Sequence, residues 1–385
     1  MTPSSPRPYA LVLTRNLPPL VGGMERLVWH IVDELRADYR VHVVAPVGSK
    51  PNLPPNVTAS EVPLSPLTWF LLRTLFTVLW PALRLRPCMV LAGSGLTAPF
   101  AWLAARLTGA RSIVYLHGLD IEAKQPLYRL FWRPFFRRFD LVLVNSRFTR
   151  QLAIDAQIAP QRISILPPGV ELPETEKRAA LRSDFRSKHG LGDAPIMLYV
   201  GRITARKGLA VFAQSIFPKV AGAIPTARLI VIGGEPANAL LQSEKQRARI
   251  DRALTYAGLT DRALFLGKQD DAQVDAAYFA ADVLIFPVQQ SPGDNEGFGM
   301  VAVEAAAHGL PTVAFAAGGV ADAVAEGISG RLITANDNEG FAQAVIEQLG
   351  NMTTAEQSAA CARFAEDFAW PAFGERLRAY LRGCS

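Results

Sequence analysis

The segment LPPGVELPETE, at residues 166–176, lies between two stretches of sequence that share one rhythm of secondary structure. Proline lacks a backbone N–H and glycine favours turns, so this segment cannot continue a helix or a strand. On each side of it, short apolar runs alternate with longer helical patterns. The chain has 385 residues, more than one hydrophobic core ordinarily accommodates. We therefore predict a domain boundary at this segment.

Each half contains five apolar runs that predict strands buried on both faces of a parallel sheet. The runs are YALVLT (9–14), VHVVA (41–45), CMVLA (88–92), SIVYLH (112–117) and LVLVN (141–145), then PIMLYVG (195–201), ARLIVIGG (227–234), ALFLG (263–267), DVLIFPV (282–288) and PTVAFAA (311–317). Strands that alternate with helices are typical of doubly wound α/β domains, which bind ligands at the carboxyl ends of their strands. We therefore predict an α/β protein with two such domains that face each other across a ligand-binding cleft.

The composition limits the class of protein. Hydrophobic residues make up 50% of the chain, which excludes global disorder. The three cysteines have no paired spacing, so we expect a reducing compartment and neither a disulfide framework nor a cysteine metal site. The N-terminal residues MTPSSPRP lack the apolar run of a signal peptide. These features predict a cytoplasmic protein.

The net charge of +6 is unevenly distributed along the chain. Residues 1–175 carry 19 Lys and Arg against 11 Asp and Glu, whereas residues 176–385 carry 21 against 23. An acidic surface is therefore an expected partner of the first half only. Since no nucleic-acid-binding module is recognisable, we do not expect that partner to be nucleic acid.

Two carboxylates stand out in PGDNEGFGMVAVEAAAHGLP, residues 292–311. Glu296 follows a predicted strand, and Glu304 lies about one turn into a predicted helix that ends before Pro311. The backbone amides of Phe298 and Gly299 belong to the start of this helix, where N–H groups have no partner within the helix. The loop thus offers acceptors and donors to a polyhydroxylated ligand. The alternative is an ordinary turn followed by a hydrogen-bonded acid on a helix face.

Two cations follow the first predicted strand of the second half. In PIMLYVGRITARKG, Arg202 and Lys207 come directly after the strand, where a phosphate group would bind. The spacing is not that of a nucleoside-triphosphate P-loop. No acid lies beside the two cations in the sequence, so we interpret them as phosphate ligands in preference to an ordinary solvated pair.

Gly-Gly pairs occur at two predicted helix starts, in VGGMERLVWHIV (21–32) and AGGVADAVAEG (317–327). A helix N-terminus with exposed amides binds anions, so Gly22 and Gly23 in one domain, with Gly318 and Gly319 in the other, predict a site for a diphosphate. For the second pair, a role in turn formation alone remains an alternative.

The segment LAGSGLTA (91–98) has the spacing of a dinucleotide-binding loop. We interpret it as a chance match, because no acid ends the next strand, where the ribose partner should lie. That strand ends instead in His117, a candidate active-site residue. An isolated histidine in such a position is more often structural. No set of His, Asp and Glu has the spacing of a metal site.

Taken together, these motifs resemble the retaining glycosyltransferases of the GT-B fold, specifically the large family 4. EGFGMVAVE resembles the Glu-x7-Glu motif of that family, VGRITARKG its strand-end cations, VGGMER its glycine-rich first loop and YLHG its active-site histidine segment. The closing stretch FAWPAFGERLRAYLR resembles the last helix of the family, which crosses back to the first domain. The resemblance implies Rossmann-like domains at 1–170, for the acceptor, and 171–368, for the nucleotide sugar, with a returning helix at 369–385.

The resemblance also implies roles for individual residues. Arg202 and Lys207 would hold the donor diphosphate, and Glu304 would accept hydrogen bonds from the ribose. The hydroxyls of the transferred sugar would be held by Glu296 and by the amides of Phe298 and Gly299. Gly22 or Gly23 would approach the phosphates, and His117 would lie near the sugar. The donor would be a UDP- or GDP-sugar, with no metal or cofactor, and transfer would retain the anomeric configuration.

Other functions remain open. A nucleotide-sugar epimerase with the same fold would share the nucleotide-binding half, and a catalytically inactive protein could bind the same ligand. An NAD-dependent oxidoreductase would depend on the GSGLTA loop. The acceptor that we favour is a lipid-linked glycan, or one of lipopolysaccharide or exopolysaccharide, at the cytoplasmic face of the membrane.

Two segments of the first half predict contact with an anionic membrane. LTWFLLRTLFTVLWPALRL (67–85) is too interrupted to span a bilayer but is apolar around most of a helical wheel. LYRLFWRPFFRRF (127–139) places Arg129, Arg133 and Arg137 on one stripe among aromatic residues. The alternative is that both are ordinary domain helices with apolar faces in the core.

Overall fold

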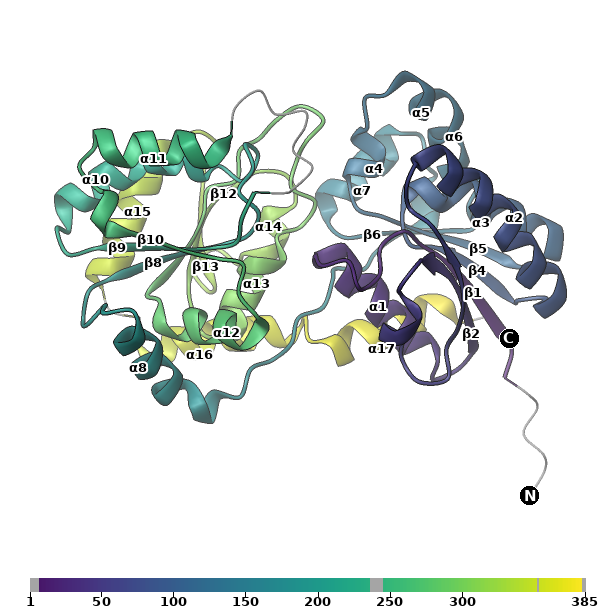
Figure 1. Cartoon of the computed structure of the whole chain (residues 1–385), viewed down its shortest axis with the longest axis horizontal. Coiled ribbons are helices and arrows are strands. Elements are labelled where there is room, and N and C mark those ends of the chain that lie inside the picture. Colours follow the sequence, from purple (N-terminus) through teal and green to yellow (C-terminus); the bar gives the residue numbers. More distant parts are fainter. Residues whose placement is uncertain (1–6, 236–244, 352, 383–385) are drawn as a thin grey trace. The chain divides into compact units, whose positions relative to one another are not determined.

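The computed structural model describes residues 7–235, 245–351 and 353–382 (Figure 1). The chain forms two compact units. The first extends up to Gly169 and includes the chain from Trp370 onward, and the second is Val170–Ala369.

The first unit is built on a seven-stranded, fully parallel sheet. Its strand order is β3-β2-β1-β4-β5-β6-β7. The strands are β1 (Tyr9–Leu13), β2 (Arg40–Pro46), β3 (Thr58–Val62), β4 (Met89–Ala92), β5 (Arg111–Leu116), β6 (Leu141–Val144) and β7 (Ile163–Ile165). Alternate residues of each central strand enter two different buried clusters, because both faces of the sheet are covered.

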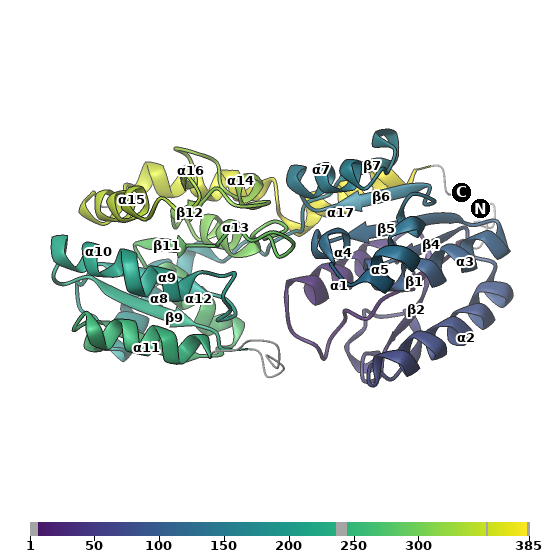
Figure 2. The same ribbon diagram turned by 90° about the horizontal axis from the view of Figure 1, so that it is seen from above.

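Helices form a layer on each face of this sheet. One face is covered by α1 (Gly23–Leu35) and α17 (Trp370–Leu381). The helices α2 (Leu67–Leu85), α3 (Ala98–Thr108), α4 (Leu119–Glu122), α6 (Arg133–Phe136) and α7 (Arg147–Asp155) cover the other face, with α5 (Pro126–Phe131) packed on α6. Figure 2 shows α2 and α3 along this second face.

The second unit is built on a six-stranded parallel sheet of order β10-β9-β8-β11-β12-β13. Its strands are β8 (Ile196–Val200), β9 (Arg228–Ile232), β10 (Ala263–Gly267), β11 (Val283–Phe286), β12 (Thr312–Phe315) and β13 (Gly330–Ile333). The order reverses between β8 and β11, so the loops after these two strands emerge side by side. In doubly wound sheets this is the place where ligands bind.

The helices of the second unit also lie on both faces of its sheet (Figure 1). One face carries α9 (Leu209–Val211), a π-helical turn, α10 (Phe217–Ala223), α11 (Gln246–Tyr256) and α15 (Asn338–Gly350). The other carries α8 (Arg178–Lys188), α12 (Asp271–Ala280) and α13 (Met300–Ala307), with α16 (Ala355–Glu366) packed on α13. A single turn, α14 (Val320–Ala323), follows β12.

The predicted α/β architecture with two doubly wound domains is confirmed, and all ten predicted strands are present. The prediction omitted β3, β7 and β13, which lie at sheet edges. Edge strands are short and need not be apolar throughout, so they do not produce continuous apolar runs. The helix predicted to follow Gly319 is only one turn long, and a turn of this length has no N-terminal anion site.

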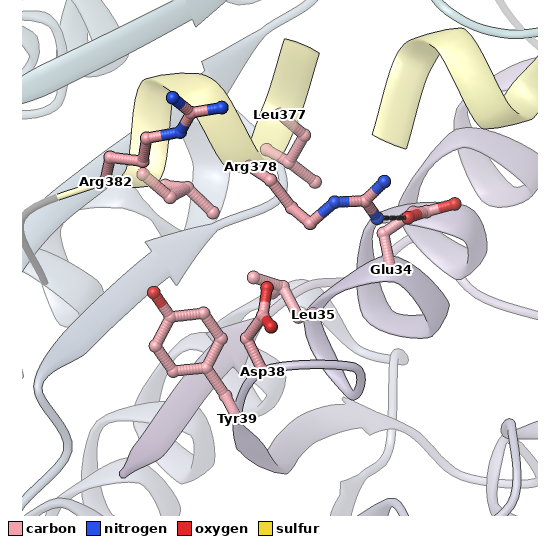
Figure 3. A pocket seen from close by; sticks show the side chains of 8 residues that line it. Glu34, Leu35, Asp38, Tyr39, Leu377, Arg378 and Arg382 are labelled. Carbon is pink, nitrogen blue, oxygen red and sulfur yellow. Dashed lines mark hydrogen bonds and ion pairs between the residues drawn. The ribbon is translucent and has the colours of Figure 1, made fainter. Parts of the chain in front are cut away.

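The closing helix α17 packs on α1 within the first unit. The rings of His30 and Trp370 stack 3.5 Å apart, and burial lowers the pKa of His30 to about 4, so its ring is uncharged at neutral pH. Figure 3 shows the ion pair of Glu34 with Arg378 beside a pocket of about 270 Å³. This pocket is lined by residues of α1 and α17 and by residues that follow the ends of these helices, and none of the predicted site residues lines it.

Candidate active site

A charged cluster lies at the reversal point of the second sheet. The loop after β8 contributes Arg206 and Lys207, and the loop after β11 contributes Glu296. The Nζ of Lys207 is 2.8 Å from Oε2 of Glu296, and the Arg206 guanidinium pairs with the same oxygen. These three side chains are only 10–14% exposed. The structure therefore brings together two predicted site residues, Lys207 and Glu296, with a third that was not predicted.

Arg206 and Lys207 occupy only one of the two carboxylate oxygens of Glu296. Both contact Oε2 of Glu296, and no hydrogen bond or ion pair to Oε1 is found within the described residues. An ionised carboxylate accepts hydrogen bonds at both oxygens. Oε1 can therefore accept hydroxyl groups of a ligand while Oε2 stays with the cations.

The protonation states in the cluster follow from burial and charge. Burial alone would raise the pKa of Glu296, but the neighbouring Lys207 and Arg206 outweigh it and lower this pKa to about 2. Burial lowers the pKa of Lys207, while Glu296 acts in the opposite direction. Glu296 is thus a carboxylate at neutral pH, and an incoming anion would favour the charged form of Lys207.

The two loops of the cluster are fastened to each other through Arg206. Its carbonyl oxygen accepts the backbone N–H of Gln289 at 2.8 Å, and its Nε lies 3.1 Å from Oδ1 of Asp294. Gly208 has a φ of +73°, and a Cβ at this position would lie 1.8 Å from the carbonyl oxygen of Pro287. Close approach of the two backbones therefore requires glycine here.

A second turn holds the backbone of Glu296. The amide of Gly319 donates to the carbonyl oxygen of Glu296 at 2.8 Å. Gly318 has a φ of +57°, and a Cβ there would lie 2.4 Å from the same oxygen. The prediction that this Gly-Gly pair forms a helix-start anion site was wrong, since the Gly319 amide is used by the Glu296 loop and only one helical turn follows.

The predicted amide donors lie at the start of α13. Gly299 is its N-terminal capping residue with a φ of +107°, and no side chain caps the helix there. The side chain of Phe298 is 2% exposed and packs against Phe368, with ring centroids 5.7 Å apart. Only the backbone of Phe298 can therefore meet a ligand.

Glu304 lies within α13, partly buried. Its Oε2 accepts a hydrogen bond of 3.0 Å from the hydroxyl of Tyr278. The helix thus orients a carboxylate with a hydrogen-bonded neighbour, which fits both the predicted ligand role and the alternative of a helix-face acid.

Arg202 is exposed at the end of β8. Its carbonyl oxygen accepts the hydroxyl of Tyr199 at 2.9 Å, which fixes the turn at the strand end. The positive charge of Arg202 helps to lower the pKa of Lys207, so the two side chains are electrostatic neighbours. Three cations therefore surround one strand end.

His117 lies in the first unit, at the carboxyl end of β5, and is 9% exposed. Its Nε2 is 2.9 Å from the carbonyl oxygen of Gly93, which follows β4. A carbonyl oxygen only accepts hydrogen bonds, so Nε2 must carry the proton and Nδ1 is the acceptor of a neutral ring. The backbone amide of His117 donates to Asp120 at 3.0 Å, which fixes the strand end.

Gly22 and Gly23 also belong to the first unit, where they begin α1 at exposed positions. A Cβ on Gly22 would lie 2.5 Å from Oε2 of Glu25. The other oxygen of Glu25 accepts a hydrogen bond of 2.7 Å from Asn16, in the loop after β1. The helix start is therefore built closely around its own first-turn acid.

The dinucleotide-like loop does not leave room for a ligand at Gly95. A Cβ there would lie 2.6 Å from the hydroxyl of Tyr128 and 2.8 Å from Phe136. Packing against the protein itself accounts for this glycine, in agreement with its interpretation as a chance match. In the part of the chain that the structure describes, no group of three or more His, Cys, Asp or Glu could hold a metal ion.

Sequence reasoning missed Arg206 and Asp294. Arg202 and Lys207 were interpreted as cations with no neighbouring acid, but the fold brings Glu296 to Lys207 and Asp294 to the adjacent Arg206. The signal for Arg206 was the ARKG segment itself, in which an arginine directly precedes the predicted phosphate ligand.

Comparison with known proteins gives a consistent assignment for both units. The family described as "Glycosyltransferase Family 4" matches residues 21–174, and "Glycosyl transferases group 1" matches residues 194–351. The chain is similar to a GDP-mannose-dependent alpha-(1-6)-phosphatidylinositol monomannoside mannosyltransferase of Mycolicibacterium smegmatis. The two are 29% identical over 297 residues, which is 75% of each protein.

Solved structures share the fold of the whole chain. Anabaena Alr3699/HepE, crystallised with UDP, has a TM-score of 0.80 at 19% identity and covers 97% of this chain and 99% of its own. A sucrose-phosphate synthase of Thermosynechococcus elongatus has a TM-score of 0.78 at 21% identity and covers 98% of both chains. At this level of identity the likeness extends to the fold alone.

Proposed function

The chain belongs to glycosyltransferase family 4, a family of retaining hexosyltransferases with the GT-B fold, and on that premise we propose that it moves a hexose from a nucleoside-diphosphate sugar to a membrane-borne acceptor. The second unit would bind the donor and the first unit the acceptor. The identity of the nucleotide base stays open, because the mycobacterial relative is GDP-mannose-dependent whereas HepE was crystallised with UDP.

One observation supports the donor site above all. Lys207, Arg206 and Glu296 form a buried cluster at the reversal point of the second sheet, where doubly wound domains bind nucleotides. A cluster of cations fits a diphosphate, and a carboxylate with one unoccupied oxygen fits sugar hydroxyls. One cluster of side chains would thus recognise both ends of the bond that is broken.

In the proposed reaction, the bond between the anomeric carbon and the phosphate oxygen breaks. The nucleoside diphosphate leaves with one additional negative charge, and the acceptor oxygen bonds to the same face of the anomeric carbon. The proton of the acceptor hydroxyl passes to the departing phosphate, so that charges balance. Arg202 and Lys207 would stabilise the developing charge, and preorganised donors of this kind each contribute roughly a hundredfold or more in rate.

For the remaining predicted residues we propose the following roles. Glu304, supported by Tyr278, would accept hydrogen bonds from the ribose, and the amides of Phe298 and Gly299 would donate to the sugar. In the first unit, the Nδ1 of His117 would accept a hydroxyl hydrogen bond, and the exposed amides of Gly22 and Gly23 would approach the phosphates. No step in this scheme requires a metal ion.

The acceptor class rests on the mycobacterial relative, whose name describes a phosphatidylinositol mannoside acceptor. We propose a lipid-linked glycan, or one destined for lipopolysaccharide or exopolysaccharide, met at the cytoplasmic face of the membrane. The fold alone does not select it, since a sucrose-phosphate synthase shares that fold.

A ligand screen followed by product analysis tests the proposal. Thermal unfolding is measured with UDP, GDP and their hexose conjugates; the donor nucleotide at a hundred times its Kd should stabilise the protein by about 2.7 kcal/mol. The selected donor is then incubated with lipid acceptors in chelator, and proton NMR should show an α-linked product from an α-linked donor. Isomerised donor would identify an epimerase, and stabilisation without turnover a binding protein. A β-linked product, or full loss of activity in chelator, would contradict the proposed mechanism.

A further inference from the structure

The helix α2 exposes large apolar side chains on the face that points away from its sheet. Five of them, each more than half exposed, are Trp69, Leu72, Phe76, Trp80 and Leu83. At 100° per residue they lie within about 80° of one another on a helical wheel. We call this set the apolar stripe of α2.

The stripe is not the core face of the helix. Core contacts of α2 are made by Phe70, Val78 and Ala82, each at most 2% exposed. The helix is therefore apolar on both sides, with one side buried in the unit and the other side uncovered. The alternative, that this segment is a domain helix whose apolar face lies in the core, holds for Phe70, Val78 and Ala82 but does not account for the apolar stripe.

Arginines flank the stripe and contact its aromatic rings. The guanidinium of Arg73 lies 5.7 Å from the ring of Trp69, and that of Arg84 lies 5.6 Å from the ring of Trp80. Tryptophan beside arginine is typical of segments that lie in the headgroup layer of a membrane, because the ring enters the acyl boundary and the charge stays with the phosphates.

A basic pocket lies on the same face of the sheet, beside α5 and α6. Lys124, Arg129, Arg133 and Arg137 line this hollow of about 550 Å³, and Asp155 is the one acid in its lining. Asp155 accepts a hydrogen bond from Gln151. The Nε of Arg133 is buried with no hydrogen-bond partner in the described chain.

In the described part of the chain, the positive charges that line this pocket are not neutralised by neighbouring carboxylates. No ion pair links Lys124, Arg129 or Arg133 to a carboxylate among the residues that the structure covers. Burial and the repulsion of Arg129 and Arg137 lower the pKa of Arg133. An anionic group in the pocket would relieve this repulsion. The neighbouring surface continues the apolar character, since Leu127, Leu130 and Phe131 of α5 are 55–70% exposed.

The sequence between Glu61 and Asp140 accounts for most of the positive charge of the first unit. It contains ten Lys and Arg and only two acids, Asp120 and Glu122. From residue 62 to residue 119 there is no acid at all. A surface that is both apolar and poor in carboxylates, with Asp155 as the one acid in its pocket, matches an anionic bilayer better than a protein partner or water.

We propose that the apolar stripe of α2 lies in the headgroup region of an anionic bilayer, with the basic pocket of α5 and α6 holding lipid phosphate groups. The occupant of the whole surface is the bilayer itself. In the structured part of the chain, none of the helices has the length and apolar character needed to cross a membrane. Contact is therefore interfacial. The inference deepens the proposed function, on which its biological purpose rests, because it states how the enzyme reaches a membrane-borne acceptor.

Co-sedimentation with vesicles tests this surface. The wild type should bind vesicles of phosphatidylcholine with phosphatidylglycerol and bind phosphatidylcholine alone weakly. Trp69, Phe76 and Trp80 changed together to Gln should release the protein. Arg129, Arg133 and Arg137 changed together to Gln should lower partitioning by roughly a hundredfold, since each basic residue at an anionic leaflet contributes about fivefold. Salt should weaken the arginine contribution by screening.

Matched controls use exposed residues of the second unit. Tyr256→Gln removes an aromatic ring that is 96% exposed, and Lys188, Arg249 and Arg363 changed together to Gln remove three exposed charges. Both controls should sediment like the wild type. Equal loss in the controls and in the stripe or pocket variants would overturn the assignment of this surface.

Tryptophan fluorescence gives a readout of direct insertion. Brominated lipid should quench the wild type, and Trp69→Phe with Trp80→Phe should lose most of this quenching while still sedimenting with vesicles. Unchanged quenching in that variant would place the contact elsewhere. Sedimentation velocity without lipid tests the alternative of a dimer. If it shows a stable dimer that dissociates when Trp69, Phe76 and Trp80 are changed together to Gln, the stripe is an interface between copies and the bilayer proposal is wrong.

The test separates this inference from the proposed function. Donor hydrolysis and nucleotide-induced stabilisation do not need the membrane, so stripe variants should retain both at the wild-type level. A wild type that hydrolyses donor but ignores vesicles would end the surface proposal and leave the function standing. A protein that binds vesicles but neither binds nor hydrolyses a nucleotide sugar would do the reverse.

Discussion

The Nζ of Lys207 lies 2.8 Å from Oε2 of Glu296, so a cation predicted to bind phosphate and a carboxylate predicted to bind sugar are direct partners. This ion pair fixes the position of Lys207 before a ligand binds. Lys207 is held in one geometry by a buried neighbour, and the mutual repulsion of Lys207 and Arg206 is offset by the charge of Glu296. Donor groups that are already oriented need little reorganisation when charge develops on a leaving group.

The first prediction concerns the phosphate ligands. Lys207→Ala and Arg202→Ala should each lower kcat/KM by roughly a hundredfold or more, because in the proposed mechanism each removes a donor to the leaving diphosphate. Steady-state kinetics with the selected donor measure this effect, and thermal unfolding checks that each variant is folded. Arg249→Ala, an exposed cation of α11, serves as the control and should behave like the wild type. Folded variants with turnover within roughly threefold of the wild type would refute the assigned roles.

The second prediction separates a positioning role of Arg206 from a catalytic one. Its side chain joins Asp294 to Glu296, and its backbone fastens the loop at Gln289. Arg206→Ala should raise the KM for the donor about tenfold or more by releasing this loop, with a smaller effect on kcat. Arg206→Lys keeps one charge but cannot bridge two carboxylates with a planar fork, so it should rescue only in part. If Arg206→Lys had the wild-type KM for the donor, the charge at position 206 alone would account for its role, and the bridge between the two carboxylates would not be needed.

The third prediction follows from the lowered pKa of Glu296. Its pKa falls from the ordinary 4.5 to about 2 in the folded protein. Between these values the unfolded chain binds more protons, so this contribution to stability is present above pH 4.5 and is lost as the pH falls to about 2. Denaturant unfolding of the full chain over this range should show a smaller pH dependence for Glu296→Gln than for the wild type. Identical slopes for the two proteins would contradict the lowered pKa.

The sequence was sufficient for the central strands because they are buried on both faces and are therefore apolar at every position, as in Ile196–Val200. It was insufficient at the sheet edges. Thr58–Val62 is only partly buried over most of its length, and Ile163–Ile165 has three residues, so neither stands out from a loop.

The sequence predicted the position of residues that directly follow a strand. It did not predict which residues of two different loops contact each other. Lys207 and Glu296 each come soon after a strand of the second sheet, which placed them at its carboxyl edge. The partnership of Arg206 with Asp294 depends on which strands are neighbours in the sheet, and a single sequence does not state the strand order. For the same reason, the amide of Gly319 was taken for a ligand donor although it serves the Glu296 loop.

The last prediction tests whether the backbone turn at Gly318 holds Glu296 in place. Gly318 has a φ of +57°, and a Cβ there would lie 2.4 Å from the carbonyl oxygen of Glu296 and 3.2 Å from its nitrogen. Backbone atoms cannot move aside as a flexible side chain can, so Gly318→Ala should displace the Glu296 segment. Gly327 also has a positive φ, +72°, but no atom within 4 Å of an added Cβ. Gly327→Ala therefore carries the conformational strain alone, about 1 kcal/mol.

The comparison of these two variants isolates the steric effect on the site. Denaturant unfolding should show a larger loss of stability for Gly318→Ala than for Gly327→Ala. Donor kinetics should show a rise in KM of at least about tenfold for Gly318→Ala only, since Glu296 would be displaced from Lys207 and from the sugar hydroxyls that we propose it binds. Equal effects of the two substitutions on KM would mean that the turn at Gly318 does not position Glu296, and that the ion pairs with Lys207 and Arg206 hold the carboxylate by themselves.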